Sequence, residues 1–200
     1  PVVNQGECGS DWAFSTVANI EGVNFVVNGQ LTALSVEELV DCDTSSYGCN
    51  GGFMANAYEY LLQKQGGNIM TAASWPYNSG ASNCSFANKT VGATITGYTQ
   101  IAQDERTIQD FTATYGPVAV GVDASSWQFY QSGVLTNCNY TEITSGVAIV
   151  GYNDAATTPY WILKNSWGSD WGLNGFIYVQ KGVNACGITN YALTAFAAKN

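Results

Sequence analysis

The sequence predicts an α+β protein with a helical first half and a strand-rich second half. Segments with helical periodicity and with helix start and stop signals fall within residues 10–67. Short runs rich in valine, isoleucine and aromatic residues fall after residue 116. We therefore expect two lobes in one compact unit, a helical lobe over residues 1–95 and a strand-rich lobe over residues 96–200.

The first predicted helix begins after Ser10, a residue type favoured at helix N-caps, and ends near Asn28-Gly29. Its apolar residues recur at three- and four-residue steps, at Phe14, Val17, Ile20 and Val23.

Two shorter helices are expected next. Ser35-Val-Glu-Glu38 matches a capping box, in which the serine and the second glutamate each bond the other's backbone, and it predicts a helix toward Cys42. The run from Phe53 to Gln65 predicts a third helix, ended by Gly66-Gly67.

In the second half, residues 91–99 alternate as a strand does and residues 104–115 predict one more helix. The remaining predicted strands cover residues 117–123, 145–152, 160–164 and 175–180.

Composition limits the function. Six lysines and arginines against 15 acidic residues give a net charge of −9, and the pI is near 4.1. Such a chain is a poor partner for nucleic acid or for anionic membranes. No run of about 18 apolar residues is present to span a membrane. The acidity fits solubility in an acidic or extracellular setting.

The six cysteines form an even set without the paired Cys-x-x-Cys spacing of zinc sites, and the chain has no histidine. We expect neither a metal nor a cofactor. Sequons at Asn83, Asn88 and Asn139, together with the cysteines, favour a secreted or lysosomal/endosomal location. The residues alone leave 15 disulfide connectivities open. Pro1 is interpreted as a processed or trimmed start.

Six sequence blocks, in this order, resemble the papain family of cysteine proteases. They are residues 5–15 (QGECGSDWAFS), 34–43 (LSVEELVDCD), 48–52 (GCNGG), 116–120 (GPVAV), 146–152 (GVAIVGY) and 164–168 (KNSWG). The resemblance covers nearly the whole chain and is strongest to cathepsin L-type enzymes, particularly the cruzipain-like enzymes of kinetoplastids. It implies a helical left lobe and a β-barrel-like right lobe with a cleft between them.

The resemblance also implies three disulfides, Cys8–Cys49, Cys42–Cys84 and Cys138–Cys186. Each would stabilise the fold by roughly 4 kcal/mol on the chain-entropy account. This pairing leaves no free thiol.

The same resemblance places Asp11 where the family has its nucleophilic cysteine and Ser145 where it has its histidine. Asn165, which would orient that histidine, and Gln5, which would contribute to the oxyanion hole, are both retained. Because the nucleophile and the base are both replaced, we expect a catalytically inactive homologue.

Other chemistries are weaker hypotheses. Asp11 as a nucleophile has no imidazole to activate water, and as a base for Ser145 an aspartate with a pKa of about 3.9 is too weak at neutral pH. An aspartic dyad needs a second carboxylate. An engineered, silenced form of an active endopeptidase is a further alternative. Structurally, an acid in the first turn of a helix contributes about 0.3–1 kcal/mol, and we expect Ser145 to donate a hydrogen bond to Asp11.

By position, several residues are expected to bind substrate. Asn50, Gly51 and Gly52 would pair with an extended peptide, and their glycines would allow a close approach. Phe53, Met54, Ile143 and Tyr191 would line the main specificity pocket, with the bulky Tyr191 partly filling it. Trp167 and Trp171 would form an aromatic wall or pack internally. The expected partners of this monomer are extended peptides or protease-inhibitor-like proteins.

Overall fold

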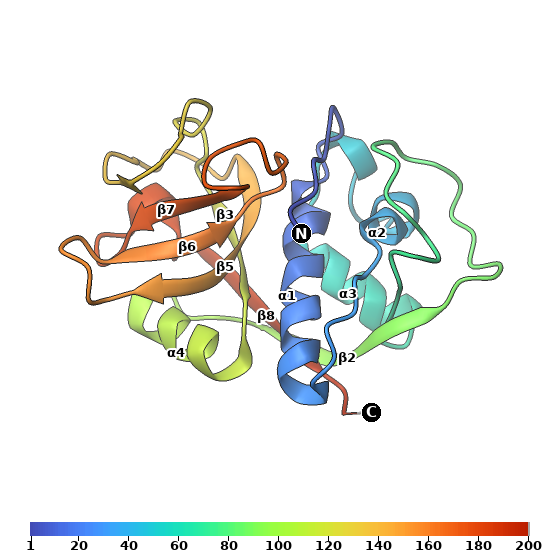
Figure 1. Ribbon diagram of the computed structural model, residues 1–200. Coiled ribbons are helices and arrows are strands. Elements are labelled where there is room, and N and C mark those ends of the chain that lie inside the picture. The colour runs from blue at the N-terminus through green and yellow to red at the C-terminus, as the bar shows by residue number, and fades with distance from the viewer. Residues whose placement is uncertain (200) are drawn as a thin grey trace.

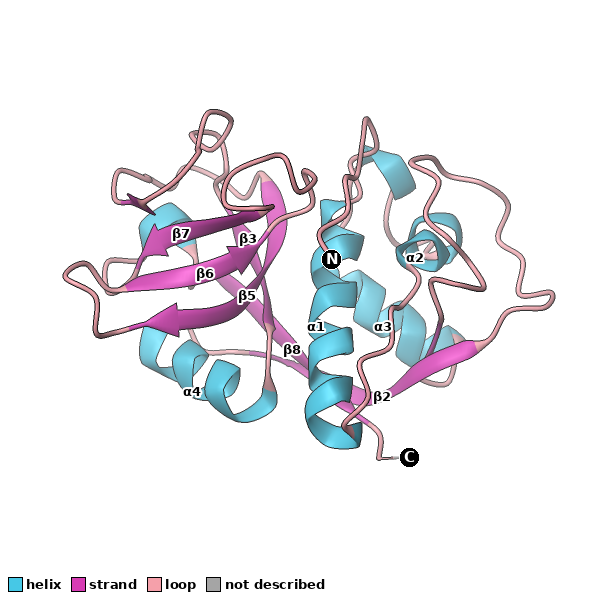
Figure 2. Ribbon diagram, viewed as in Figure 1, coloured by secondary structure: helices cyan, strands magenta, loops and turns pink. Residues whose placement is uncertain are grey.

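The computed structural model describes residues 1–199, and it confirms the α+β prediction (Figure 1). One side of the molecule is helical and the other is built around a sheet, with one helix standing between them in the view (Figure 2). The helices are α1 (Asp11–Asn28), α2 (Val36–Cys42), α3 (Met54–Lys64) and α4 (Glu105–Tyr115), with short 3-10 helices η1 (Gly48–Asn50) and η2 (Ala185–Gly187).

Helix α1 has the predicted bounds, but the predicted role of Ser10 is wrong. The Ser10 side chain caps no backbone N–H within the described chain. Its hydroxyl instead hydrogen-bonds the Tyr77 hydroxyl at 2.7 Å. The helix ends at Gly29, whose φ of 73° is left-handed and whose N–H donates to the Phe25 carbonyl.

Helices α2 and α3 are confirmed, although the capping box is only half formed. The Ser35 hydroxyl accepts from the Glu38 N–H at 3.0 Å. The Glu38 carboxylate does not return the bond, because it accepts from the Met70 N–H at 2.6 Å. Helix α4 begins after Asp104, whose side chain accepts from the Thr107 N–H.

The eight-stranded sheet has the order β1-β2-β8-β3-β5-β6-β7-β4 and is antiparallel except between β4 and β7. All five predicted strands are confirmed. Strands β1, β4 and β8 were not predicted. The strands are β1 (Asn68–Met70), β2 (Val91–Gln100), β3 (Val118–Val122), β4 (Val134–Leu135), β5 (Ser145–Asn153), β6 (Tyr160–Lys164), β7 (Phe176–Gln180) and β8 (Tyr191–Ala197).

The described residues form two hydrophobic cores, and α1 contributes side chains to the first of them. The helical core includes Trp12, Tyr58 and Leu61, and the sheet core includes Trp127 and Trp161, all of them almost fully buried. Burial of this apolar surface is the main force that stabilises the helical part, built on α1, α2 and α3, and the sheet part, built on β3, β5, β6 and β7.

Helix α1 joins the two cores through close packing and one buried amide. A Cβ added to Gly22 would lie 2.2 Å from the Pro117 ring, so α1 can approach the sheet part this closely only with glycine there. The Asn19 side chain donates to the Pro117 carbonyl at 2.6 Å and accepts from the Tyr58 hydroxyl at 2.7 Å and the Ala195 N–H at 2.9 Å. The middle of α1 is thereby held against the sheet.

The three disulfides pair as the resemblance implied, Cys8 with Cys49, Cys42 with Cys84 and Cys138 with Cys186. All six cysteines are used. None of the helices within residues 1–199 combines the length and the apolar character needed to cross a membrane.

Candidate active site

Asp11 and the start of β5 meet where α1 begins. Asp11 is the first residue of α1, and its Oδ2 accepts from the Gly146 N–H at 2.6 Å. A Cβ added to Gly146 would lie 2.8 Å from the Ser15 hydroxyl and 3.3 Å from the Asp11 carbonyl oxygen. Glycine at position 146 therefore allows the strand to reach the helix.

Burial is the main influence on Asp11, and it raises the pKa of the carboxyl. The Gly146 backbone, the Asp11 backbone, and the Gln5 and Ser145 side chains lower the same pKa, in decreasing order. The principal hydrogen bond thus comes from the Gly146 backbone, with the Ser145 hydroxyl as a weaker contributor. The expected contribution of Ser145 is therefore present but secondary, because the main donor is the N–H of the next residue in the strand, Gly146.

Gln5 lies beside Asp11, where the resemblance implied an oxyanion-stabilising amide. Its Nε2 donates to the Cys8 carbonyl at 3.0 Å, and its Oε1 accepts from the Ser166 hydroxyl at 2.6 Å. Both ends of the amide are held, so the side chain has a fixed orientation near the Asp11 carboxylate.

Asn165 is 3% exposed and has an unsatisfied donor. Its Oδ1 accepts from the Ser166 N–H at 2.9 Å, whereas its Nδ2 has no hydrogen-bond partner among residues 1–199. Leaving such a group unpaired costs about 1–3 kcal/mol. Asn165 therefore retains hydrogen-bonding capacity that this chain does not use.

The residues expected to pair with a peptide lie at the end of η1. Gly51 has a φ of 109°, and a Cβ there would meet no atom within 4 Å. A Cβ on Gly52 would lie 2.7 Å from the Trp12 ring. The need for glycine at position 52 therefore comes from internal packing on Trp12, which the sequence did not show.

Three of the four expected pocket residues converge. The Tyr191 ring meets Phe53 edge-on at 6.3 Å between centroids. A Cβ on Gly121 would lie 3.0 Å from Ile143 and 3.2 Å from Tyr191. The Tyr191 hydroxyl accepts from the Ala55 N–H at 3.3 Å, near the start of α3. Tyr191 thus fills the space between Phe53 and Ile143.

Met54, the fourth expected pocket residue, is 3% exposed. Its sulfur lies 3.3 Å from the position of a Cβ on Gly146, so it packs between α3 and β5.

Trp167 and Trp171 form an aromatic cluster with the fully buried Trp127. The Trp167 and Trp171 rings are 4.9 Å apart edge-on, and the Trp127 and Trp171 rings stack at 6.3 Å. Trp127 was missed from the sequence, because a lone tryptophan gives no sign of the distant residues that it contacts. These contacts favour the internal-packing interpretation of the tryptophans.

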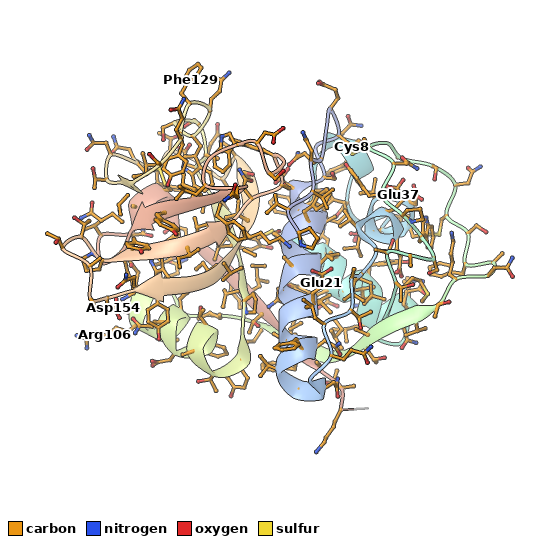
Figure 3. The ribbon with its side chains drawn as sticks, in the orientation of Figure 1. Cys8, Glu21, Glu37, Arg106, Phe129 and Asp154 are labelled. Carbon is orange, nitrogen blue, oxygen red and sulfur yellow. A yellow bond between two sulfur atoms is a disulfide. The ribbon has the colours of Figure 1, made fainter. Side chains whose placement is uncertain are left out.

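A hollow of about 500 Å³ runs along α1 and includes Gly146 and Asn165 in its lining. Most of its wall is apolar, and it also contains Glu21, which is labelled on α1 in Figure 3. Burial raises the pKa of Glu21. The lining includes none of the residues expected to bind substrate.

Asn83, Asn88 and Asn139 are all exposed. Within residues 1–199, no group of three or more histidine, cysteine or acidic residues could hold a metal ion.

A helical part and a mainly antiparallel sheet that meet at the amino end of one long helix define the papain-like class of fold. The chain matches the description "Papain family cysteine protease" over residues 1–196. It belongs to that family.

The chain is also similar to individual cysteine proteinases. The chain is 46% identical over 198 residues to a cysteine proteinase of Trypanosoma brucei brucei, with 98% of this chain and 44% of that protein aligned. It is 44% identical over 199 residues to cysteine proteinase B of Leishmania mexicana, with 98% and 45% aligned. The predicted similarity to kinetoplastid enzymes is confirmed. The chain spans about half the length of the curated relatives it matches.

Among solved structures, the Carica candamarcensis cysteine protease CMS1MS2 in complex with E-64 superposes with a TM-score of 0.88. It is 35% identical, and the alignment covers 98% of this chain and 92% of that one. Digestive procathepsin L 3 of Tenebrio molitor has a TM-score of 0.89 and 37% identity, with 98% and 66% covered.

Proposed function

We propose that this chain is a papain-family homologue that binds extended peptides or protease-inhibitor-like proteins without cleaving them. The observation that carries the proposal is Asp11. The motif resemblance assigns it to the nucleophile's position, and it is held by the Gly146 N–H in a chain without histidine. Relatives are named as proteinases, so the proposed loss belongs to this chain's own residues.

Hydrolysis by substituted chemistry has little support. Ser145 is 6% exposed, and the nearby Asp11 carboxylate already accepts a 2.6 Å hydrogen bond. General-base catalysis needs a group whose pKa lies near the working pH and which reaches the nucleophile's proton. No imidazole exists to do so, and nothing favours an engineered origin.

The proposed ligand lies between the two lobes, residues 1–95 and 96–200; the Carica enzyme to which the chain is similar was solved in complex with E-64. An extended peptide would run past Asn50 and Gly51, and a Cβ added to Gly51 meets no atom within 4 Å. Phe53 and Ile143, which are 51% and 37% exposed, would contact its side chains. Tyr191 fills the space between them, so the proposed protein binds bulky apolar side chains only weakly.

The three disulfides support a proposed secreted or lysosomal/endosomal location, because such bonds persist in oxidising compartments. The exposed Asn83, Asn88 and Asn139 are the proposed glycosylation sites of a monomer.

Tyr191→Ala tests the proposed binding mode. Removing the ring should raise affinity for peptides with a leucine or phenylalanine side chain at least about tenfold, because burial of such a side chain stabilises by about 1.5–3 kcal/mol. Calorimetric titration of wild type and variant measures the change.

Two controls accompany this test. Tyr191→Phe keeps the ring and should leave affinity nearly unchanged, and Tyr115→Ala removes a 44% exposed ring at the end of α4. Absence of peptide binding by every variant would reject the proposed function, whereas equal gains in Tyr191→Ala and Tyr115→Ala would reject the role of Tyr191.

A further inference from the structure

The acidic side chains of helix α2 accept hydrogen bonds from a long segment of chain, residues 70–84, and hold it against the helix. Glu38 Oε2 accepts from the Met70 N–H at 2.6 Å, and Glu37 Oε2 accepts from the Asn78 N–H at 3.1 Å. Asp41 accepts from the Trp75 indole at 3.1 Å, and also from the Ser82 N–H. The Cys42–Cys84 disulfide closes the far end.

Two of these carboxylates are buried and incompletely satisfied. Glu37 and Glu38 are both 0% exposed, and the Oε1 atom of each has no hydrogen-bond partner in the described part of the chain. Figure 3 labels Glu37 within the helical part. A buried carboxylate with an unpaired oxygen is unfavourable in its ionised form.

No cation compensates for this burial. Tyr60 from α3 interacts with both Glu38 and Asp43, the residue after α2; burial first, and then these two carboxylates, raise the pKa of Tyr60. Asp41 and Tyr77 face Glu37. Neither lysine nor arginine is among the groups that shift the two glutamate pKa values.

Lys89 is the basic residue that contacts residues 70–84, and its contacts are with Trp75 and Ser74. Lys89 lies 4.6 Å above the Trp75 ring and donates to the Ser74 carbonyl.

We propose that Glu37 and Glu38 form a pH-sensitive carboxylate latch, which holds residues 70–84 tightly in acidic solution and loosens at neutral pH. The latch is a property of the helical part and does not depend on peptide binding.

The direction of the pH effect follows from the pKa of these glutamates in the folded chain and in the unfolded chain. Burial raises the pKa of Glu38 from 4.5 to about 7 and also raises that of Glu37. As pH rises above 4.5, the unfolded or locally opened chain loses its proton first, and stability falls until about pH 7, where the folded form also ionises. Below pH 4.5 both states are protonated and the full stability of the latch is present.

A loosening of residues 70–84 would affect the candidate active site through Tyr77, which belongs to this segment. The Tyr77 hydroxyl donates to the Gln5 carbonyl at 2.7 Å, and its ring meets Phe14 edge-on at 4.8 Å. Residues 70–84 therefore support the turn that leads into Asp11.

Glu38→Gln tests the latch, with Glu142→Gln as the control because Glu142 is exposed. Denaturant unfolding at pH 4.5 and pH 8 gives the unfolding equilibrium constant of each variant. A group with these two pKa values raises that constant about 100-fold over this range. Glu142→Gln should keep this rise and Glu38→Gln should lose it. Equal pH dependence in the two variants would overturn the proposal.

Hydrogen exchange of the wild type provides a second measurement, which decides the matter even if Glu38→Gln fails to fold. Protection factors of the Met70 and Asn78 amides, whose N–H groups bond Glu38 and Glu37, should fall from pH 4.5 to pH 8. Protection that stays constant, or rises, would contradict the latch.

Discussion

The helical part and the sheet part each bury an acidic side chain, with opposite consequences. Glu38 in α2 accepts one hydrogen bond and leaves one oxygen unpaired, and its pKa rises to about 7. Asp123, just after β3, is 2% exposed but accepts from both the N–H and the hydroxyl of Ser125 and of Thr141, and its pKa falls well below the usual range.

The number of donors and the degree of desolvation together decide the sign of the shift. Hydrogen bonds to the charged form of a carboxyl lower its pKa, and desolvation raises it. At Asp123, hydrogen bonds from four donors outweigh desolvation, and the pKa falls. At Glu38, one donor does not outweigh desolvation, and the pKa rises. The sheet part should therefore lose stability in acid, and the helical part as the pH rises toward neutrality.

Among the changes that test whether the two parts behave separately, removal of the Cys42–Cys84 disulfide should have the largest effect on stability. The double change Cys42→Ala and Cys84→Ala releases a loop with a sequence separation of 42 and should cost roughly 4 kcal/mol. Denaturant unfolding measures the cost. Hydrogen exchange should show the loss of protection confined to residues 70–90, whereas Cys138→Ala with Cys186→Ala should act on the sheet part. Uniform loss in both variants would show that the two parts do not behave separately.

Asp123→Ala should have a smaller effect with its own pH dependence. Removing an ionised acceptor of four hydrogen bonds should cost about 2–3 kcal/mol at pH 6. Because the folded pKa lies below the unfolded value of 3.8, this contribution is present above about pH 4 and is lost as the pH falls.

The matched control for Asp123→Ala is Asp110→Ala, an exposed position on α4. Thermal unfolding at pH 6 and pH 2.5 compares the two variants. A cost at Asp123 that is equal at both pH values would show that the carboxylate charge is not what the loop requires.

Local sequence signals predicted most of the elements. Periodicity, capping residues and glycine stops found α1 to α4, and β-branched runs found five strands. Strand β8 (Tyr191–Ala197) was missed because it is rich in alanine, which is uncommon in strands, and because it forms by pairing with β2 and β3, distant in sequence.

The candidate site was predicted only as far as the family motif extends. The motif located Asp11 and Asn165, but not the Gly146 N–H as the main donor to Asp11. Glu37 and Glu38, two acids in the first turn of a helix, gave no sign of burial in the sequence. Their partners, Asn78 and Met70, lie 41 and 32 residues away.

Hydrolysis of peptide substrates by the wild type and by the double variant Asp11→Cys with Ser145→His tests the central proposal most directly. Loss of the nucleophile or base lowers turnover roughly a million-fold in serine proteases, so the wild type should show no cleavage above background. The double variant should gain thiol-dependent cleavage, with Asn165 and Gln5 already in place. Turnover by the purified wild type, together with covalent labelling of residue 11 by an epoxide inhibitor, would contradict it.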